Sequence, residues 1–223
     1  MALDQIVRAR SRSGQALAAR ITTSSPAARP ASRSTRTGIV TCRLLETLLF
    51  GDHRIPMNVV RIRPEADIRE AAESAFDQHR SRILRLLPHA QIEHVGATSI
   101  PGALTKGDLD VLVRVGSHDF DAAVQRLRGL YAIHQPGNWT ATLASFVDRE
   151  AADPPVGVQL VVAGSPDDLM FGTFRDAMIR APQLLVEYNA LKLRHDGDDY
   201  ERYTDAKARF VCEVLARAGS RGL

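Results

Sequence analysis

The sequence predicts an α+β fold, in which a small mixed sheet has flanking helices and is followed by a helical C-terminal subdomain. Segments with alternating apolar residues, typical of strands, lie between segments whose apolar residues recur every three to four positions, typical of helices. After Ser165 only the helical periodicity remains. The 223 residues, 44% of them hydrophobic and 25% charged, are enough to bury one core.

The first element is an amphipathic helix predicted over residues 67–87, where apolar residues recur at helical spacing. Asp67 and Glu70 have the spacing of a capping box at its start. Residues 91–95 follow as a short strand. The stretch 96–107 is broken by glycines and a proline, so we expect a loop there.

Alternation predicts the next strand over 108–115. Apolar residues at helical spacing then predict a helix over 118–130. Two more strands are expected at 141–148 and 156–163. The pairing order of these strands is not predicted.

Three helices are expected to close the chain, at about 166–179, 182–195 and 198–218. Ser165 precedes a proline, and this order is typical of a helix start, with serine as the N-cap residue. The last helix has one continuous apolar stripe. These helices form the predicted C-terminal subdomain.

Residues 1–56 are expected to be a disordered or weakly structured leader. Residues 1–45 contain eight arginines and one acid, a net charge of +7, whereas the rest carries 21 basic and 25 acidic residues, or −4. The run Ile21–Gly38 has no periodic apolar face and cannot offset the cost of ordering it. A transit peptide and a start codon assigned too early, with Met57 as the true start, both fit this composition. The domain itself is predicted over 57–220.

The composition also bears on location and partners. No apolar run approaches the roughly 20 residues that span a membrane, and the basic charge belongs to the leader rather than to the folded part. We therefore expect a cytoplasmic protein with a small-molecule ligand, and neither a membrane nor a nucleic acid as partner. No protein partner is indicated.

The strand over 108–115 carries the first candidate site. Asp108 and Asp110 lie on one face of it, about 7 Å apart at their Cα atoms, while the alternate positions are apolar. Burying two like charges is costly unless a cation joins them, and Mg²⁺ prefers carboxylate oxygens and keeps positions open for phosphates. The alternative is a strand-entry turn with two solvated aspartates.

The loop before this strand suits a phosphate. Gly96 lets the backbone approach a ligand, and Thr98 and Ser99 add hydroxyls. Lys106 lies just ahead of the aspartates and is expected to neutralise phosphate charge. Nucleotidyl transfer requires mainly positioning and charge stabilisation, which a metal-bound carboxylate pair and a phosphate cradle supply.

A glycine, a small residue and, after about ten residues, Asp-x-Asp on a strand resemble the core motif of the polymerase-beta-like nucleotidyltransferase superfamily. More narrowly, His94–Gly102, HVGATSIPG, resembles the signature of the GrpB family, and Lys106–Val113 continues it. Four later segments resemble further motifs of that family: Phe174-Arg175-Asp176, Ala181-Pro182, Tyr188…Lys192 and Tyr203…Lys207. The resemblance covers about residues 65–218. It implies a nucleotidyltransferase-like fold and a nucleotide site; GrpB domains are mostly uncharacterised, and some are fused to dephospho-CoA kinases.

The chain departs from that pattern at four points. Ala97 replaces the usual serine after Gly96. Asp110 matches the family's constant acid, and Asp108 is additional. Gln159 occupies a strand position that is often histidine. The third carboxylate of active nucleotidyltransferases has no secure counterpart, and the nearest strand candidates are Asp148 and Glu150.

The sequence thus predicts a Mg²⁺-dependent nucleotidyltransferase that uses a nucleoside triphosphate and an unidentified acceptor. Asp108 and Asp110 are expected to hold the metal and carry catalysis. The expected phosphate ligands are Gly96, Thr98, Ser99, Lys106, Arg175, Lys192 and Lys207. For the last three, a solvated helix face is the alternative. Two other functions stay open: an inactive domain that binds a nucleotide or a coenzyme A precursor or assists a partner enzyme, and a chaperone-like interaction domain.

Overall fold

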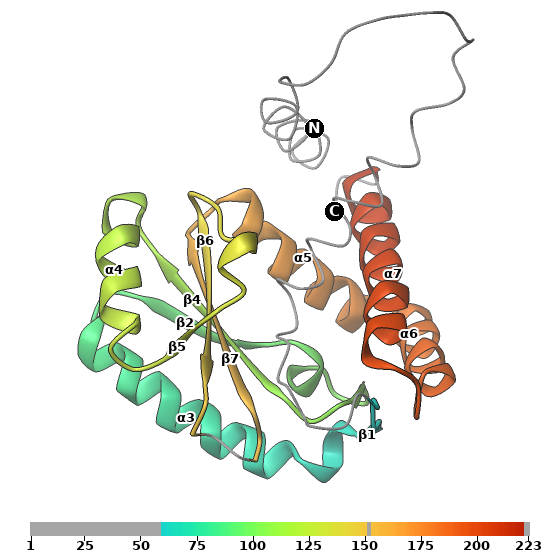
Figure 1. Ribbon diagram of the computed structural model, residues 1–223. Coiled ribbons are helices and arrows are strands. Elements are labelled where there is room, and N and C mark those ends of the chain that lie inside the picture. Colours follow the sequence, from blue (N-terminus) through green and yellow to red (C-terminus); the bar gives the residue numbers. More distant parts are fainter. Residues whose placement is uncertain (1–58, 151–152, 221–223) are drawn as a thin grey trace, which may run out of the picture.

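The computed structural model describes residues 59–150 and 153–220 (Figure 1). Within this part a five-stranded sheet has the order β2-β4-β7-β6-β5. Its strands are β2 (Gln91–Val95), β4 (Leu109–Val115), β5 (Ala132–His134), β6 (Leu143–Asp148) and β7 (Val156–Val162). The central pair, β4 and β7, is parallel, and the other neighbours are antiparallel. The predicted mixed sheet is confirmed.

Helices cover both faces of this sheet (Figure 1). They are α3 (Arg69–Leu86), α4 (Phe120–Leu127), α5 (Pro166–Arg180), α6 (Pro182–Arg194) and α7 (Tyr200–Ser220). The first two pack on one face, and the last three, the predicted C-terminal subdomain, pack on the other. The α+β class is therefore confirmed.

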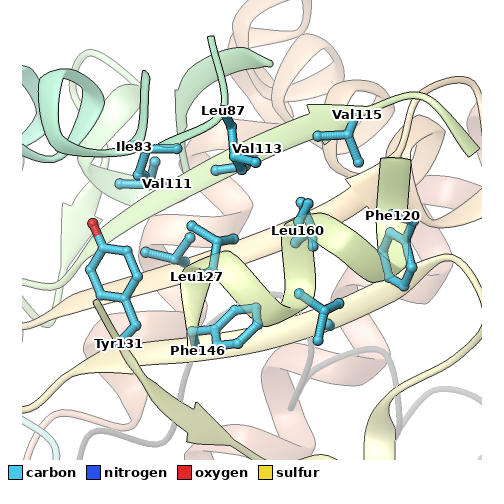
Figure 2. Close-up of a cluster of buried hydrophobic side chains, with 14 of the residues drawn as sticks. Ile83, Leu87, Val111, Val113, Val115, Phe120, Leu127, Tyr131, Phe146 and Leu160 are labelled. Carbon is cyan, nitrogen blue, oxygen red and sulfur yellow. The ribbon is translucent and has the colours of Figure 1, made fainter. Parts of the chain in front are cut away.

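Successive side chains of β4 point to opposite faces of the sheet, so they pack alternately against the α3–α4 layer and the α5–α7 layer. Val111 and Val113 belong to the apolar cluster beneath α3 and α4, together with Ile83, Leu127 and Phe146 (Figure 2). Leu112, on the opposite face, packs in the cluster beneath α5, α6 and α7. Asp110 is two residues before Leu112 on the same strand and therefore points to the same face, under the C-terminal helices.

Three short strands escaped prediction. One is β5, and the others are β1 (Arg63–Pro64) and β3 (Leu104–Thr105), which pair with each other in a separate two-stranded sheet. Strands of two or three residues are too short to show a period, and β3 interrupts what the sequence suggested was a loop.

The helix starts were predicted with mixed success. The side chain of Ser165 accepts a hydrogen bond from the backbone N–H of Asp168 at 3.2 Å, which confirms the cap of α5. The predicted capping box of α3 is wrong, because no side chain caps this helix. Asp67 lies in a 3₁₀ turn ahead of it, and Glu65 in that turn instead binds the Arg69 guanidinium at 2.5 and 2.6 Å.

The predicted leader, residues 1–56, lies outside the described residues. Among the helices that are described, none combines the length and the apolar character needed to cross a membrane.

Candidate functional site

The candidate site is centred on Asp108 and Asp110, at the amino-terminal end of β4. Both side chains are buried, with exposed fractions of 6% and 1%. Burial raises the pKa of Asp110 well above its ordinary value, and the neighbouring Asp108 carboxylate adds to this effect. The Oδ1 atom of Asp110 is buried and accepts no hydrogen bond from the residues that the structure describes. The two aspartates therefore fit the expected Mg²⁺, since a cation would occupy this oxygen and offset the cost of the paired charges.

Three lysines from separate parts of the chain converge on this pair. Lys106 reaches from the loop before β4, and its Nζ lies 3.4 Å from Asp108 Oδ2 and 3.0 Å from the hydroxyl of Tyr200, to which it donates. The charges of Lys207, Lys106 and Lys192 all act to lower the pKa of Asp110. Lys192 and Lys207 are buried, so the alternative of a solvated helix face does not hold for these two lysines.

Lys192 and Lys207 each lie beside the tyrosine four residues before them. Lys192 is 1% exposed, donates to the backbone carbonyl of Leu104 and has its Nζ 3.9 Å from the centre of the Tyr188 ring. Burial, and then the charge of Lys207, lower its pKa well below the ordinary value. Lys207, 3% exposed, has its Nζ 5.6 Å from the centre of the Tyr203 ring. Because the helical spacing of four puts each pair on one face, one helix turn supplies both the ring and the charge.

The loop between β2 and β4 packs directly on the aspartates. A Cβ atom on Gly96 would lie 2.2 Å from Asp110 Oδ2, and the φ angle of Gly96 is +77°. Only glycine is compatible with both conditions. The backbone approach predicted for Gly96 is therefore made to the Asp110 carboxylate itself.

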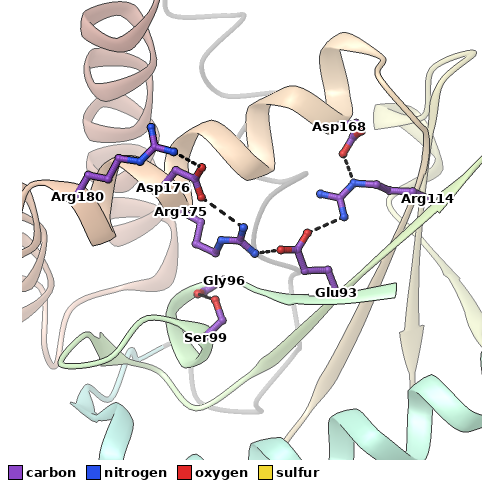
Figure 3. Close-up of polar contacts among 8 residues, drawn as sticks. All are labelled: Glu93, Gly96, Ser99, Arg114, Asp168, Arg175, Asp176 and Arg180. Carbon is purple, nitrogen blue, oxygen red and sulfur yellow. Dashed lines mark hydrogen bonds and ion pairs between the residues drawn. The ribbon is translucent and has the colours of Figure 1, made fainter. Parts of the chain in front are cut away.

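The hydroxyls of Thr98 and Ser99 stabilise the conformation of this loop through hydrogen bonds. The Thr98 hydroxyl donates to the carbonyl of Asp108 at 3.1 Å and contacts His94 Nε2 at 2.9 Å. The Ser99 hydroxyl donates to the carbonyl of Gly96 at 2.8 Å (Figure 3). Both hydroxyl hydrogens are thus engaged within the protein, and the sequence did not predict this bracing role.

Arg175 forms its ion pairs with acidic residues other than Asp108 and Asp110. It pairs with Glu93 of β2 and with Asp176, 3.3 Å away, in a chain of ion pairs that Figure 3 shows. Glu93 also binds Arg114 of β4 at 2.6 Å, and Arg114 binds Asp168 of α5 at 2.5 Å. Arg175 therefore contributes to the attachment of α5 to the sheet.

Neither candidate for a third carboxylate reaches the site. Asp148 ends β6 with the parity of Phe146, so it lies on the α3 face, 3.5 Å from the Arg82 guanidinium and 3.8 Å from His79 Nε2. Glu150 is exposed in the turn that follows. Among the residues that the structure describes, no three His, Cys, Asp or Glu side chains form a group that could hold a metal. Both assignments were wrong, because the strand pairing that sets the parity of β6 is not visible in the sequence.

The comparison with known proteins now decides the family. The profile of the family described as "GrpB protein" matches residues 66–217, most of the chain. The chain belongs to the GrpB family. A UPF0157 protein of Vibrio cholerae is 34% identical over 148 residues, which are 66% of this chain and 78% of that protein.

GrpB relatives also appear among solved structures. The conserved GrpB protein from Enterococcus faecalis superposes with a TM-score of 0.57 at 16% identity, over 72% of this chain and 98% of that one. The RNA terminal uridylyl transferase Cid1 is more distant, with a TM-score of 0.39 at 12% identity over 57% of this chain and 39% of that one. The GrpB match supports the fold, and the Cid1 likeness is too slight to inform about activity.

Sequence reasoning missed several residues of this GrpB site. Tyr200 binds Lys106, and the Leu104 carbonyl binds Lys192. Asn189 holds the loop from α6, since its side chain accepts from the Leu104 N–H at 2.8 Å and donates to the Gly102 carbonyl at 2.9 Å. These contacts join segments more than 80 residues apart, and no local pattern signals them.

His94 makes the loop sensitive to acid. Its ring stacks on Phe76, with centroids 5.4 Å apart, and burial lowers its pKa from 6.5 to about 4 although the charge of Glu65 opposes this. The unfolded chain binds a proton on His94 more readily than the folded protein does. The contribution of neutral His94 to the free energy of unfolding is therefore fully present above pH 6.5 and is lost as the pH falls towards 4. This lowering of the His94 pKa corresponds to a loss of roughly 3 kcal/mol, at most, in the free energy of unfolding at low pH.

We expect His94→Gln to flatten the pH dependence of stability between pH 7 and pH 4.5. The measurement is urea unfolding of wild type and variant at several pH values, with His89→Gln, at an exposed position, as the control for losing a histidine. A variant that keeps the full wild-type slope would contradict the assignment to His94.

Proposed function

We propose that this GrpB domain binds a nucleoside triphosphate together with Mg²⁺ at Asp108 and Asp110. The observation that carries the proposal is the buried pair of carboxylates, in which Asp110 Oδ1 has no hydrogen-bond partner among the described residues and the Gly96 backbone packs against the Asp110 carboxylate. Such a pair is costly without a cation, and Mg²⁺ bound by carboxylates commonly also binds substrate phosphates.

The lysines support an anionic ligand. Lys106, Lys192 and Lys207 all interact with Asp110, so three lysine side chains surround two acidic ones. Burial lowers the pKa of Lys192, so the charge of this site rests mainly on Lys106 and Lys207. When Mg²⁺ joins the aspartates, the positive charge of the site exceeds the negative charge, and a polyphosphate restores the balance. In this proposal the lysines bind phosphate oxygens, while Thr98 and Ser99 keep the loop in shape.

Nucleotidyl transfer is the second candidate, favoured by the presence of both aspartates of the Asp-x-Asp motif. The acceptor oxygen would form a bond to the α-phosphorus, the bond from that phosphorus to the bridging oxygen would break, and pyrophosphate would leave. A bound Mg²⁺ supplies neutralisation of phosphate charge. The lack of a third carboxylate among the described residues favours binding without turnover.

The first test is thermal unfolding of wild type and Asp110→Asn with each of the four common nucleoside triphosphates, with Mg²⁺ and with chelator. A ligand at a hundred times its Kd adds about 2.7 kcal/mol, which is a rise in Tm of roughly 5–10 °C for a domain of this size. We expect this rise for wild type with Mg²⁺ and none for Asp110→Asn. Because the pKa of Asp110 is raised, the neutral asparagine is expected to leave the unliganded domain folded.

Asp121→Asn, at an exposed position of α4 in the opposite helix layer, is the matched control and should behave as wild type. If none of the nucleotides shifts the Tm of wild type, nucleotide binding at this site is wrong. Pyrophosphate release in the presence of candidate acceptors then separates transfer from binding alone.

A further inference from the structure

Gln159 is a fully buried polar residue in β7 that the proposed function leaves unexplained. Its side chain is 0% exposed. The Oε1 atom accepts a hydrogen bond from the Ser145 hydroxyl of β6 at 2.7 Å. The Nε2 group, equally buried, donates to no atom of the described residues. A buried donor without an acceptor destabilises the folded state, so its presence in the centre of a sheet requires a reason.

The strand register places Gln159 beside the aspartates. Asp110 pairs with Gly157 of β7, and Gln159 is the next residue of β7 on that face, with its Cα about 8 Å from that of Asp110. Gly157 has no side chain to separate them. The site face of the sheet therefore carries an acceptor, Asp110 Oδ1, and a donor, Gln159 Nε2, that are buried and have no hydrogen-bond partner in residues 59–150 and 153–220.

The surroundings of Gln159 indicate what kind of group it meets. Apart from Ser145, which lies opposite it on β6, its neighbours on the same face include two apolar residues: Leu112 on β4 and Val161 two residues along β7, both fully buried. A neutral carboxamide among apolar side chains suits an uncharged acceptor better than a phosphate oxygen. The bond from Ser145 fixes one end of the amide and so orients the other.

We propose that Gln159 is a ligand-recognition residue of the Asp108–Asp110 site, whose NH₂ group donates to a carbonyl or hydroxyl oxygen in the uncharged part of the nucleotide, its base or sugar. The inference rests on the proposed function. The phosphates lie at the aspartates and lysines, and the base or sugar lies towards Gln159. A ligand without such an oxygen leaves the donor unpaired and binds less tightly.

The experiment compares wild type, Gln159→Leu and Gln91→Leu, the last being the same change at an exposed position of β2. Affinities are measured by calorimetry with Mg²⁺ for two probes: the nucleotide that binds wild type most tightly, and inorganic tripolyphosphate. We expect Gln159→Leu to weaken nucleotide binding about tenfold and to leave tripolyphosphate binding unchanged. Gln91→Leu should change neither.

A second readout needs no ligand. Because Gln159→Leu alone would leave the buried Ser145 hydroxyl without its acceptor, this readout uses Ser145→Ala/Gln159→Leu, which removes the bonded pair and the unpaired donor together. The Tm of this unliganded double variant should equal or exceed that of wild type. A lower Tm shows that the donor is already satisfied inside the protein and overturns the inference. Gln159→Met, which keeps the side chain unbranched, replaces the leucine variant if that one does not fold.

The outcomes separate the two proposals. Wild type that binds neither probe overturns the proposed function and this inference with it. Wild type that binds the nucleotide, with equal affinity shown by Gln159→Leu, overturns the inference alone. A loss that is the same for nucleotide and tripolyphosphate also overturns it, since the contact would not be to the base or sugar.

Discussion

Replacing Gly96 by alanine is expected to destabilise the domain by more than 3 kcal/mol and to abolish nucleotide binding. The backbone of Gly96, with φ +77° and ψ −170°, lies in a region that is nearly closed to other residues and costs them about 1–3 kcal/mol. The new methyl group would also overlap the Asp110 carboxylate, whose Oδ2 is 2.2 Å and whose Cγ is 2.9 Å from the Cβ position. Asp110 is 1% exposed and has little room to move away.

Gly102→Ala is the matched control, because Gly102 also has φ +77° but its Cβ would meet only Leu185, at 3.9 Å. Urea unfolding of the two variants compares a glycine of positive φ whose Cβ position is open with one whose Cβ position is occupied by Asp110. In an Asp110→Ala background, Gly96→Ala should cost less, since the overlapping oxygen is gone. Equal costs for Gly96→Ala and Gly102→Ala would contradict the contact.

Replacing Tyr188 by alanine is expected to lower the free energy of unfolding by about 3–5 kcal/mol, a large part of the 5–15 kcal/mol typical of a domain. Tyr188 is 0% exposed. Its ring meets Phe174 of α5 edge to face, with centroids 5.5 Å apart, and stacks on Phe210 of α7 at 5.2 Å. One side chain thus joins the three C-terminal helices.

The same change should weaken nucleotide binding, because the Nζ of Lys192 loses the ring 3.9 Å away that positions it. Val186→Ala, on the same helix but 67% exposed, is expected to change stability by less than about 0.5 kcal/mol. Denaturant unfolding measures the first effect and calorimetry the second. A loss of stability no larger than that of Val186→Ala would show that the three helices do not depend on this ring.

Where the sequence predicted correctly, the signal was local. The alternation of β4 placed Asp110 on the face opposite Val111 and Val113, and the structure confirms this. The long helices were predicted because several turns of periodic pattern are hard to mistake for strand. Gly96 and the aspartates lie within one continuous stretch, so their proximity could also be expected.

What failed depended on pairing between distant segments. The faces of β6 follow from its register with β7, in which Ser145 faces Gln159 and Asp148 faces Val156. That register places Asp148 on the far side of the sheet, and the register of β7 with β4, in which Asp110 pairs with Gly157, places Gln159 beside the aspartates. The phosphate role expected for Arg175 stays a prediction, but its ion pair with Glu93 of β2 was not foreseen, because only the packing of α5 on the sheet brings the two together.

The three lysines that converge on the aspartates come from the loop before β4, from α6 and from α7. As the chain leaves the ribosome, the two acidic residues emerge almost 100 residues before Lys207. Until the last helix is made, the acidic pair lacks one of its counter-charges and the cover of that helix. The nascent sheet therefore cannot close over this pair at low cost, and completion of the site coincides with completion of the domain.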